Sequence, residues 1–186
     1  SLATIEYGDL KIKNENAFKT SVSLEKNQGI FKWNINGYMS NIDDYILIEP
    51  SGIDQISRGA FQVWSYRQTD AIFLGYDFDY SINLKKNIYL NGNFSWVWAE
   101  EESNNSPIIL IPPINFKNFL LIDDIFEKIS FSINHNHVGE QKRYPDNNYN
   151  TTIFENGNFV EKQVDISTPP KDYNLIGLSI NYNIND

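Results

Sequence analysis

The stretch "AIFLGYDFDYSI", residues 71–82, decides the fold of this chain. Apolar and polar positions alternate along it, and every second side chain forms one apolar set: Ile72, Leu74, Tyr76, Phe78, Tyr80 and Ile82. Successive side chains of a β-strand point to opposite faces, so this period of two predicts a strand with one apolar face. Its length of about 11 residues is also the length of a strand that crosses a bilayer.

Six other segments carry the same period of two, two of them more weakly. The next run, residues 88–98, places Leu90, Phe94, Trp96 and Trp98 on one face. No segment shows a clear helical period. The sequence therefore predicts an all-β chain of about seven strands, which cover residues 18–26, 31–36, 72–82, 88–98, 114–123, 129–134 and 176–184.

The connections between these strands alternate in length. Short turns are expected at residues 26–29, 84–87 and 123–128, and long polar segments at residues 49–59, 101–113 and 139–171. If consecutive strands are antiparallel, all short turns lie at one end of the sheet and all long loops at the other. This asymmetry is the main organising feature of the sequence.

Composition limits the classes of function. The net charge of -9 argues against nucleic acid as a partner, because phosphates need a basic surface. There is no cysteine, which excludes disulfides, thiolate nucleophiles and cysteine metal clusters. The first residues show no signal peptide, and no apolar run is long enough for a spanning helix. Any membrane role must therefore use strands.

An outer-membrane barrel fits this pattern better than a soluble β-sandwich. A sandwich mixes short and long connections at both ends, and its strands are usually about 5 to 6 residues long. Outer-membrane barrels have short periplasmic turns, long extracellular loops and aromatic side chains near the interfaces. The high aromatic content, 15%, agrees with the barrel.

Five stretches also resemble a known family. They are "TIEYGDLKIKNENAF" (4–18), "NGYMSNIDDYILIEPSG" (36–52), "YRQTDAIFLGYDFDY" (66–80), "ILIPPINFKNFL" (109–120) and "YNLIGLSINYNI" (173–184). In this order and spacing they resemble the C-terminal part of the barrel of TonB-dependent outer-membrane receptors. The siderophore and haem receptor-like members are the most similar, and the asparagine-rich composition is like that of Bacteroidetes proteins.

The resemblance implies a fold, a location and partners. It implies an antiparallel transmembrane β-barrel of 22 strands in the outer membrane of a Gram-negative cell, with a plug inside and transport driven by the TonB complex. The implied ligand is an iron-siderophore, haem or a cobalamin-like molecule, and no cofactor is implied. Residues 1–186 would form part of the barrel domain, because the plug, the TonB box, the last hairpins and the terminal aromatic residue are all missing. The remaining strands of the same receptor and outer-membrane lipid are then the direct neighbours.

Candidate ligand-binding residues precede the spanning strand. Counted upward from the turn at residues 84–87, residues 82 to 72 fill an apolar belt of about 25 Å. Trp64, Tyr66 and Arg67 then lie above the bilayer on the extracellular side. With unbroken alternation Arg67 faces the lumen while Trp64 and Tyr66 face outward, and a bulge would exchange these faces. A guanidinium would suit an anionic siderophore or a haem propionate, and the alternative is that "YRQTDA" forms only structural hydrogen bonds.

Other polar clusters carry weaker signals. His135 and His137 share a strand face and could hold a metal, but amphipathic rings at the outer rim of the barrel fit better, and no metal site is predicted. Asp77 and Asp79 suit a water-filled lumen better than a catalytic or cation-binding pair. The run Glu100–Glu102 is expected to be solvated rather than to bind calcium. Pro112 and Pro113 mark where a loop re-enters a strand.

Nothing in the sequence predicts an enzyme, and no catalytic residue is proposed. Nucleophile elbows, zinc-protease helices, phosphate-binding loops and EF-hand loops are all missing. Two other functions stay open beside transport by a TonB-dependent receptor. One is a porin or an outer-membrane barrel hydrolase without a plug. The other is a soluble, aromatic-rich β-domain that binds glycans.

Overall fold

The computed structural model describes residues 4–55, 61–165 and 168–184, and these residues form strands, turns and loops. The strands are β1 (Thr4–Tyr7), β2 (Asn16–Lys26), β3 (Phe31–Gln55), β4 (Phe61–Lys85), β5 (Ile88–Glu101), β6 (Asn115–Ile125), β7 (Ile129–Val138), β8 (Tyr149–Glu155), β9 (Asn158–Val164) and β10 (Tyr173–Tyr182). In this described part of the chain, no helix is long and apolar enough to cross a membrane.

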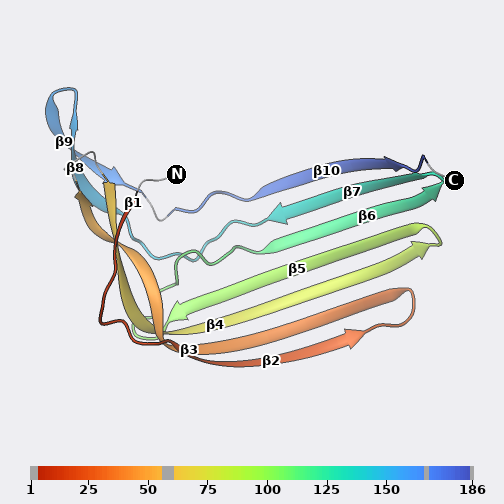
Figure 1. Cartoon of the computed structure of the whole chain (residues 1–186), viewed down its shortest axis with the longest axis horizontal. Coiled ribbons are helices and arrows are strands. Elements are labelled where there is room, and N and C mark those ends of the chain that lie inside the picture. The colour runs from red at the N-terminus through yellow and green to blue at the C-terminus, as the bar shows by residue number, and fades with distance from the viewer. Residues whose placement is uncertain (1–3, 56–60, 166–167, 185–186) are drawn as a thin grey trace.

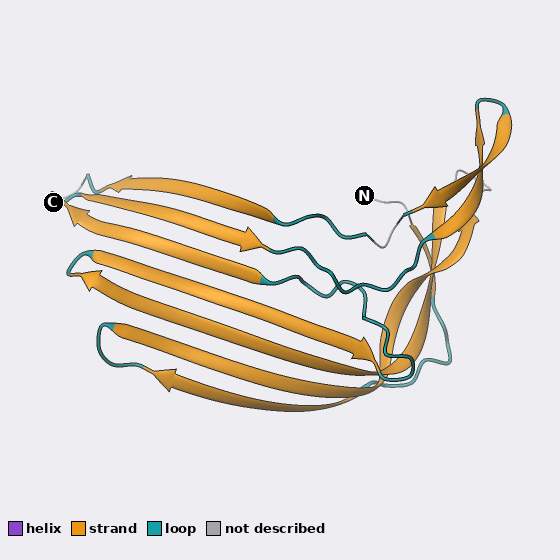
Figure 2. Ribbon diagram, turned by 180° about the vertical axis from the view of Figure 1, so that it is seen from behind, coloured by secondary structure: helices purple, strands orange, loops and turns teal. Residues whose placement is uncertain are grey.

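Seven strands lie side by side in one sheet, in the order β10-β7-β6-β5-β4-β3-β2 (Figure 1). Every neighbouring pair in this order is antiparallel. These are the seven predicted strands, and the all-β, antiparallel fold class is confirmed. The three short turns are confirmed as well, and Figure 2 shows them together at the end of the sheet opposite the long loops.

Three strands were not predicted. β1 pairs with the upper part of β4 and is parallel to it, with Thr4 opposite Gln62 and Tyr7 opposite Ser65. β8 and β9 form a separate two-stranded hairpin inside the long segment expected at residues 139–171. Their turn is Asn156–Gly157, and both residues have positive φ, 52° and 84°. Asn-Gly is the sequence that favours such a tight hairpin turn.

β3 and β4 are much longer than a bilayer requires. Each has 25 residues, so the predicted loop at 49–59 is wrong up to Gln55, and residues 56–60 lie outside the described part. At the long-loop end of the sheet the two strands bend upward together (Figures 1 and 2). The polar residues 64–69, which precede the apolar segment 72–82, are therefore part of the strand. Their ladder partners are residues 45–50 of β3.

The bend lies at a register shift between Ile42 and Tyr45 of β3. Asp44 has a φ of 55°, its N–H donates to Asp70 Oδ1 (3.0 Å), and its carbonyl accepts from Gln68 Nε2 (2.7 Å). A bulge leaves backbone groups without ladder partners, and these two side chains of β4 satisfy them. This explains why the polar residues Gln68 and Asp70 come directly before the apolar segment 72–82.

The two faces of the sheet differ sharply. Residues that are directly opposite in an antiparallel ladder share a face. The apolar face is thus formed by Leu24, Ile35, Leu74, Phe78, Phe94, Trp96, Leu120, Phe131, Ile133, Ile176, Leu178, Ile180 and their neighbours. The polar face carries mainly Ser23, Asn34, Asn36, Asp77, Asp79, Asn93, Ser95, Lys117, Asn134, Ser179 and Asn181.

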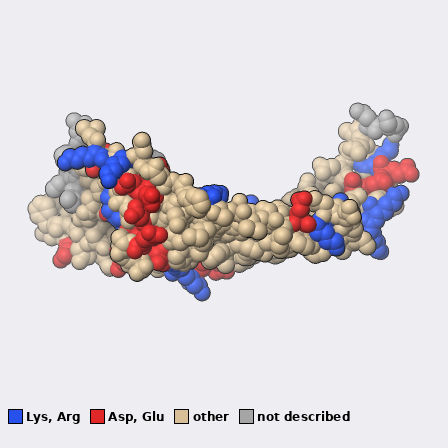
Figure 3. All heavy atoms as spheres, turned by 90° about the horizontal axis from the view of Figure 1, so that it is seen from below, with Lys and Arg blue, Asp and Glu red and all other residues tan. Residues whose placement is uncertain are grey.

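The apolar face is exposed in this chain. On the edge strand β10, Ile176, Leu178 and Ile180 are 73%, 69% and 72% exposed. Figure 3 shows the sheet edge-on as a curved layer, with charged side chains gathered mostly towards its two ends. Within the described residues, β2 and β10 each pair on one side only. A surface this apolar needs cover, and the open edges need further strands.

Candidate functional site

The loop between β5 and β6 folds back onto the polar side of the sheet at its long-loop end. Glu101 N–H donates to Ser106 O (2.9 Å), and Ile108 N–H donates to Ala99 O (3.4 Å). Ile108 is 1% exposed and packs in one cluster with Leu47, Ala71 and Ala99. This is the main apolar core of the described residues. The predicted long polar loop is therefore anchored by an apolar centre.

This loop forms one wall of a cavity of about 420 Å³. We call it the loop cavity. Its walls are Trp64 of β4, loop residues 108–113, Arg143 and Tyr144 of the segment after β7, and residues 168–171 before β10. Prolines and aliphatic side chains make it mostly apolar, while Arg143 and Lys171 add positive charge. A volume of this size suits a small-molecule ligand.

Trp64 is the predicted site residue that lies in the wall of the loop cavity. Its indole Nε1 is buried and finds no acceptor among the described residues. A buried N–H that makes no hydrogen bond costs about 1 to 3 kcal/mol. The indole N–H therefore has an unused capacity to donate a hydrogen bond.

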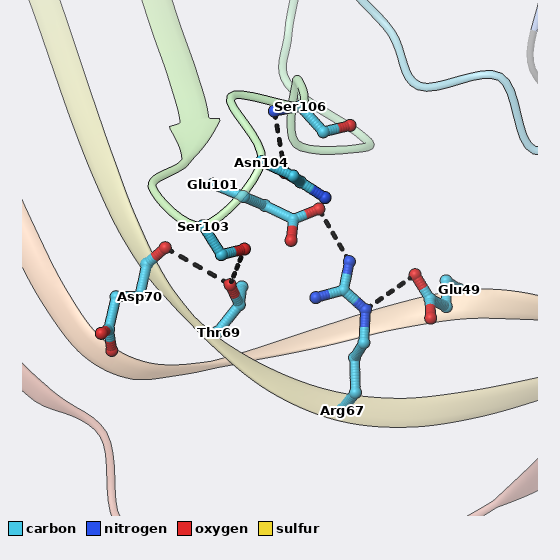
Figure 4. Close-up of polar contacts among 8 residues, drawn as sticks. All are labelled: Glu49, Arg67, Thr69, Asp70, Glu101, Ser103, Asn104 and Ser106. Atoms are coloured by element: carbon cyan, nitrogen blue, oxygen red, sulfur yellow. Dashed lines mark hydrogen bonds and ion pairs between the residues drawn. The ribbon is translucent and has the colours of Figure 1, made fainter.

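Arg67 lies on the same side of β4 as Asp77, as alternation along an uninterrupted β4 requires. Its guanidinium already contacts two carboxylates, Glu101 Oε1 at 2.7 Å from Nη2 and Glu49 Oε2 at 2.9 Å from Nε (Figure 4). The hydrogen bond to Glu101 is the main reason why the pKa of Arg67 lies above its ordinary value, and Glu49 acts in the same direction. Burial opposes this shift.

Tyr66 lies on the opposite side of β4 from Arg67. Its hydroxyl donates to Glu6 Oε2 (2.8 Å) of β1, and this hydrogen bond raises the pKa of Tyr66. The contact ties β1 to the hairpin at the point where the two strands pair. Neither Tyr66 nor Arg67 lines the loop cavity, so the structure does not bring the three predicted site residues together.

The glutamate run Glu100–Glu102 is not the solvated run that we expected. Glu101 is only 3% exposed and binds Arg67. Glu100 points to the other side of β5 and binds Arg143 Nη2 at 2.5 Å, while the Arg143 guanidinium lies 4.4 Å from the Trp98 ring centroid. Because neighbouring residues of a strand face opposite ways, adjacent carboxylates each attach a different segment.

The other polar candidates have partners in the sheet. Asp77 Oδ1 accepts from Ser95 (2.5 Å), and Asp79 Oδ1 accepts from Asn93 (2.7 Å), all on the polar face. His135 and His137 lie on the apolar face of β7. Among the residues that the structure describes, no three or more His, Cys, Asp or Glu side chains are grouped to hold a metal ion.

Replacing Arg67 by methionine tests whether this side chain is structural. Glu101 is almost fully buried, while Arg67 is about one third exposed. We therefore expect the free energy of unfolding to fall by about 2 kcal/mol, a value between the costs of breaking an exposed and a buried ion pair. The free energy of unfolding, from urea titration in lipid vesicles, measures it. The double variant Arg67→Met with Glu101→Gln should recover most of the loss. An unchanged stability together with lost ligand affinity would contradict the structural role.

Sequence comparison and structure comparison give different results. No protein-family model matches the chain, and no curated protein matches it either. Solved structures do. The copper transporter OprC aligns with 94% of this chain at a TM-score of 0.73 and 17% identity. A mutant of the ferric enterobactin receptor PfeA from Pseudomonas aeruginosa aligns with 92% at a TM-score of 0.62 and 12% identity.

The name of a third similar protein states its cellular location. The ferripyoverdine receptor of the outer membrane of Pseudomonas aeruginosa aligns with 92% of this chain at a TM-score of 0.52 and 12% identity. The fold of this chain is that of part of an outer-membrane β-barrel. All three proteins are named as transporters or receptors. This chain covers only 24%, 24% and 21% of their respective lengths, so it corresponds to about a quarter of such a barrel protein.

The residues that line the loop cavity were mostly missed from the sequence. The run "PIILIPP", residues 107–113, is apolar within a segment that we took as polar. This apolar composition could have predicted that the segment is packed against other residues. Arg143, Tyr144 and residues 168–171 gave no such signal, because they come to the cavity from separate loops.

Proposed function

We propose that this chain is part of the wall of a TonB-dependent receptor in the outer membrane of a Gram-negative cell. The apolar face meets lipid, and the polar face lines the water-filled interior with its plug. The open edges at β2 and β10 pair with further strands of the same receptor. A sheet with two open edges does not persist alone in a membrane, which supports this assignment.

The short turns then face the periplasm, and the β3–β4 hairpin, the loop cavity and the β8–β9 hairpin face the outside. The observation that carries the transport function is the loop cavity. It lies at the end of the sheet where a ligand would first arrive, and Trp64 forms part of its wall.

The ligand we propose is an iron-siderophore or haem, with a cobalamin-like molecule as the third choice. The cavity offers apolar and aromatic walls together with Lys171, while Arg143 is already paired with Glu100, and this lining suits a flat or amphipathic ligand with an acidic group. The names of two similar proteins, a ferric enterobactin receptor and a ferripyoverdine receptor, support an iron complex, while a third is named as a copper transporter. Trp64 is the residue of our predicted trio that we retain as a ligand contact.

Growth of a strain that lacks the gene tests this function. The deletion strain is grown with an iron-siderophore, haem or cobalamin, each supplied alone in a separate culture. We expect it to fail to grow in one of these cultures, and a plasmid copy of the gene should restore growth there. A strain without TonB should show the same defect. Equal growth of wild type and deletion strain with every nutrient, or uptake that needs no TonB, would overturn the proposal.

The variant Trp64→Ala tests the cavity directly, through its affinity for the ligand. We expect the ligand identified by growth to bind at least about tenfold more weakly, because an aromatic wall and a hydrogen-bond donor are lost. Tyr66→Phe is the matched control, since Tyr66 lies two residues away outside the cavity. Titration of the purified receptor measures both. Equal affinity of Trp64→Ala and wild type would place the ligand elsewhere.

A further inference from the structure

A row of polar side chains crosses the apolar face of the sheet. Asn118 of β6 lies opposite His135 of β7, and His137 of β7 lies opposite Asn174 of β10. Their neighbours on this face are apolar, among them Ile133 and Ile176. Polar side chains on a surface that meets lipid are costly, and they commonly mark a functional site.

Both histidines converge on one atom. His135 Nε2 lies 2.9 Å and His137 Nδ1 lies 3.1 Å from Asn174 Oδ1. The spacing of the two histidines along β7 puts both rings on one face, and the pairing with β10 brings the amide between them. Two ring nitrogens and one amide oxygen are thus gathered at one point.

The His135 ring is held in place from its other side. Its Nδ1 lies 3.5 Å from Asn118 Nδ2, and Tyr80 donates its hydroxyl to Asn118 Oδ1 (2.5 Å). The Tyr80 ring reaches Asn118 by lying over Gly92, where a Cβ would come within 2.3 Å of it. A chain of hydrogen bonds behind a histidine is the usual arrangement that orients a metal ligand.

We propose that His135, His137 and Asn174 form a binding site for a divalent transition metal ion. Imidazole nitrogens favour copper, nickel and zinc, and they bind at about 2.0 to 2.1 Å. The Asn174 amide turns slightly to give its oxygen as the third ligand, and water fills the remaining positions. Each histidine binds in its neutral form, with its proton on the ring nitrogen that does not face the metal ion. The Asn118 amide then turns so that its oxygen accepts a hydrogen bond from His135 Nδ1–H, while its Nδ2 donates to the Tyr80 hydroxyl oxygen.

The site lies close to water. His137 and Asn174 adjoin the pair Val138–Tyr173, which ends the β7–β10 ladder at the long-loop end. In the orientation of the proposed function this end is extracellular, so the ion reaches the site without crossing the bilayer. Only this placement rests on the proposed function, and metal binding itself does not.

The test uses the full-length receptor, purified in detergent and freed of metal with EDTA. Titration with Cu²⁺ should show one more bound ion per chain for the wild type than for His135→Gln with His137→Gln. The electron paramagnetic resonance spectrum of that ion should show coupling to imidazole nitrogens. Each single variant should weaken binding at least about tenfold, and Asn118→Leu should weaken it by a similar factor through the lost orientation of His135.

A register swap is the matched control. The double variant His135→Asn with Asn136→His keeps both histidines on β7 but moves one to the polar face, so binding should fall as in His135→Gln. Unchanged heat-dependent mobility in gel electrophoresis shows that the barrel is folded. If the swap binds like the wild type, or the double glutamine variant loses no ion, the proposal is wrong. Metal binding is measured on the purified protein and transport by growth. The metal-binding result can therefore be interpreted even if the proposed transport function is wrong.

Discussion

Replacing Ile35 by arginine should destabilise the folded protein by about 2 to 4 kcal/mol, the cost of an arginine on a lipid-facing strand near the middle of a bilayer. Ile35 lies on the apolar face, between Leu24 and Phe78 in the ladder. Its two ladder partners among the described residues are apolar, so neither can receive the guanidinium. The free energy of unfolding in lipid vesicles, from a urea titration of the full-length protein, measures the effect.

The neighbouring residue provides the control. Asn34→Arg places the same side chain on the polar face, between Glu25 and Asp79, and we expect a change below about 0.5 kcal/mol. Phe31→Arg lies on the apolar face beside the short turn and should cost at most about 1 kcal/mol, because the cost in a bilayer falls towards its interface. An equal cost at Phe31 and Ile35 would show that protein, and not lipid, covers this face.

Replacing Ile108 by alanine should loosen the whole β5–β6 loop. Ile108 is 1% exposed among Leu47, Ala71 and Ala99, and truncation of a buried isoleucine costs about 2 to 5 kcal/mol. We expect the loss to be local, because the β4–β5 and β5–β6 ladders do not include residues 102–114. The amide of Glu101, which donates to Ser106 O, should therefore exchange its hydrogen at least about thirtyfold faster.

The same variant should weaken the ligand at the loop cavity, since residues 108–113 form one of its walls. Leu110→Ala is the control for hydrogen exchange. Leu110 is two residues away in the same loop but 88% exposed, so the Glu101 amide should exchange as in the wild type. Faster exchange in Leu110→Ala, or unchanged exchange in Ile108→Ala, would contradict the anchoring role of Ile108.

The sheet could be predicted from the sequence because its physical cause is local. In residues 74–82 apolar side chains alternate with small or polar residues, since one face meets apolar surroundings and the other meets water. The hairpin above it follows another rule. Around Arg67 both faces carry polar residues, so the alternation fades although the backbone ladder continues. The period of two in the sequence therefore showed where the apolar belt ends, but β4 continues beyond that point.

The candidate site was less predictable for a different reason. Trp64 could be chosen because it precedes a recognisable strand, but its cavity is completed by Arg143, Tyr144 and residues 168–171 from other loops. Contacts between distant loops leave no periodic trace in a sequence. The Asn156–Gly157 turn of the β8–β9 hairpin was a local signal that we could have read.

The bulge at Asp44 sets the direction in which the upper part of β3 and β4 leaves the sheet. Asp70 and Gln68 bind its N–H and its carbonyl, so two side chains of β4 hold the bulged backbone. Above the bulge, the packing of Leu47 against Ile108 attaches the same part of the hairpin to the β5–β6 loop. The part of β4 before Ala71 is about 30 Å long, so a change of about 10° in its direction would displace its far end by about 5 Å. Trp64 lies on this part of β4, so the direction set at the bulge affects where the indole stands in the cavity wall.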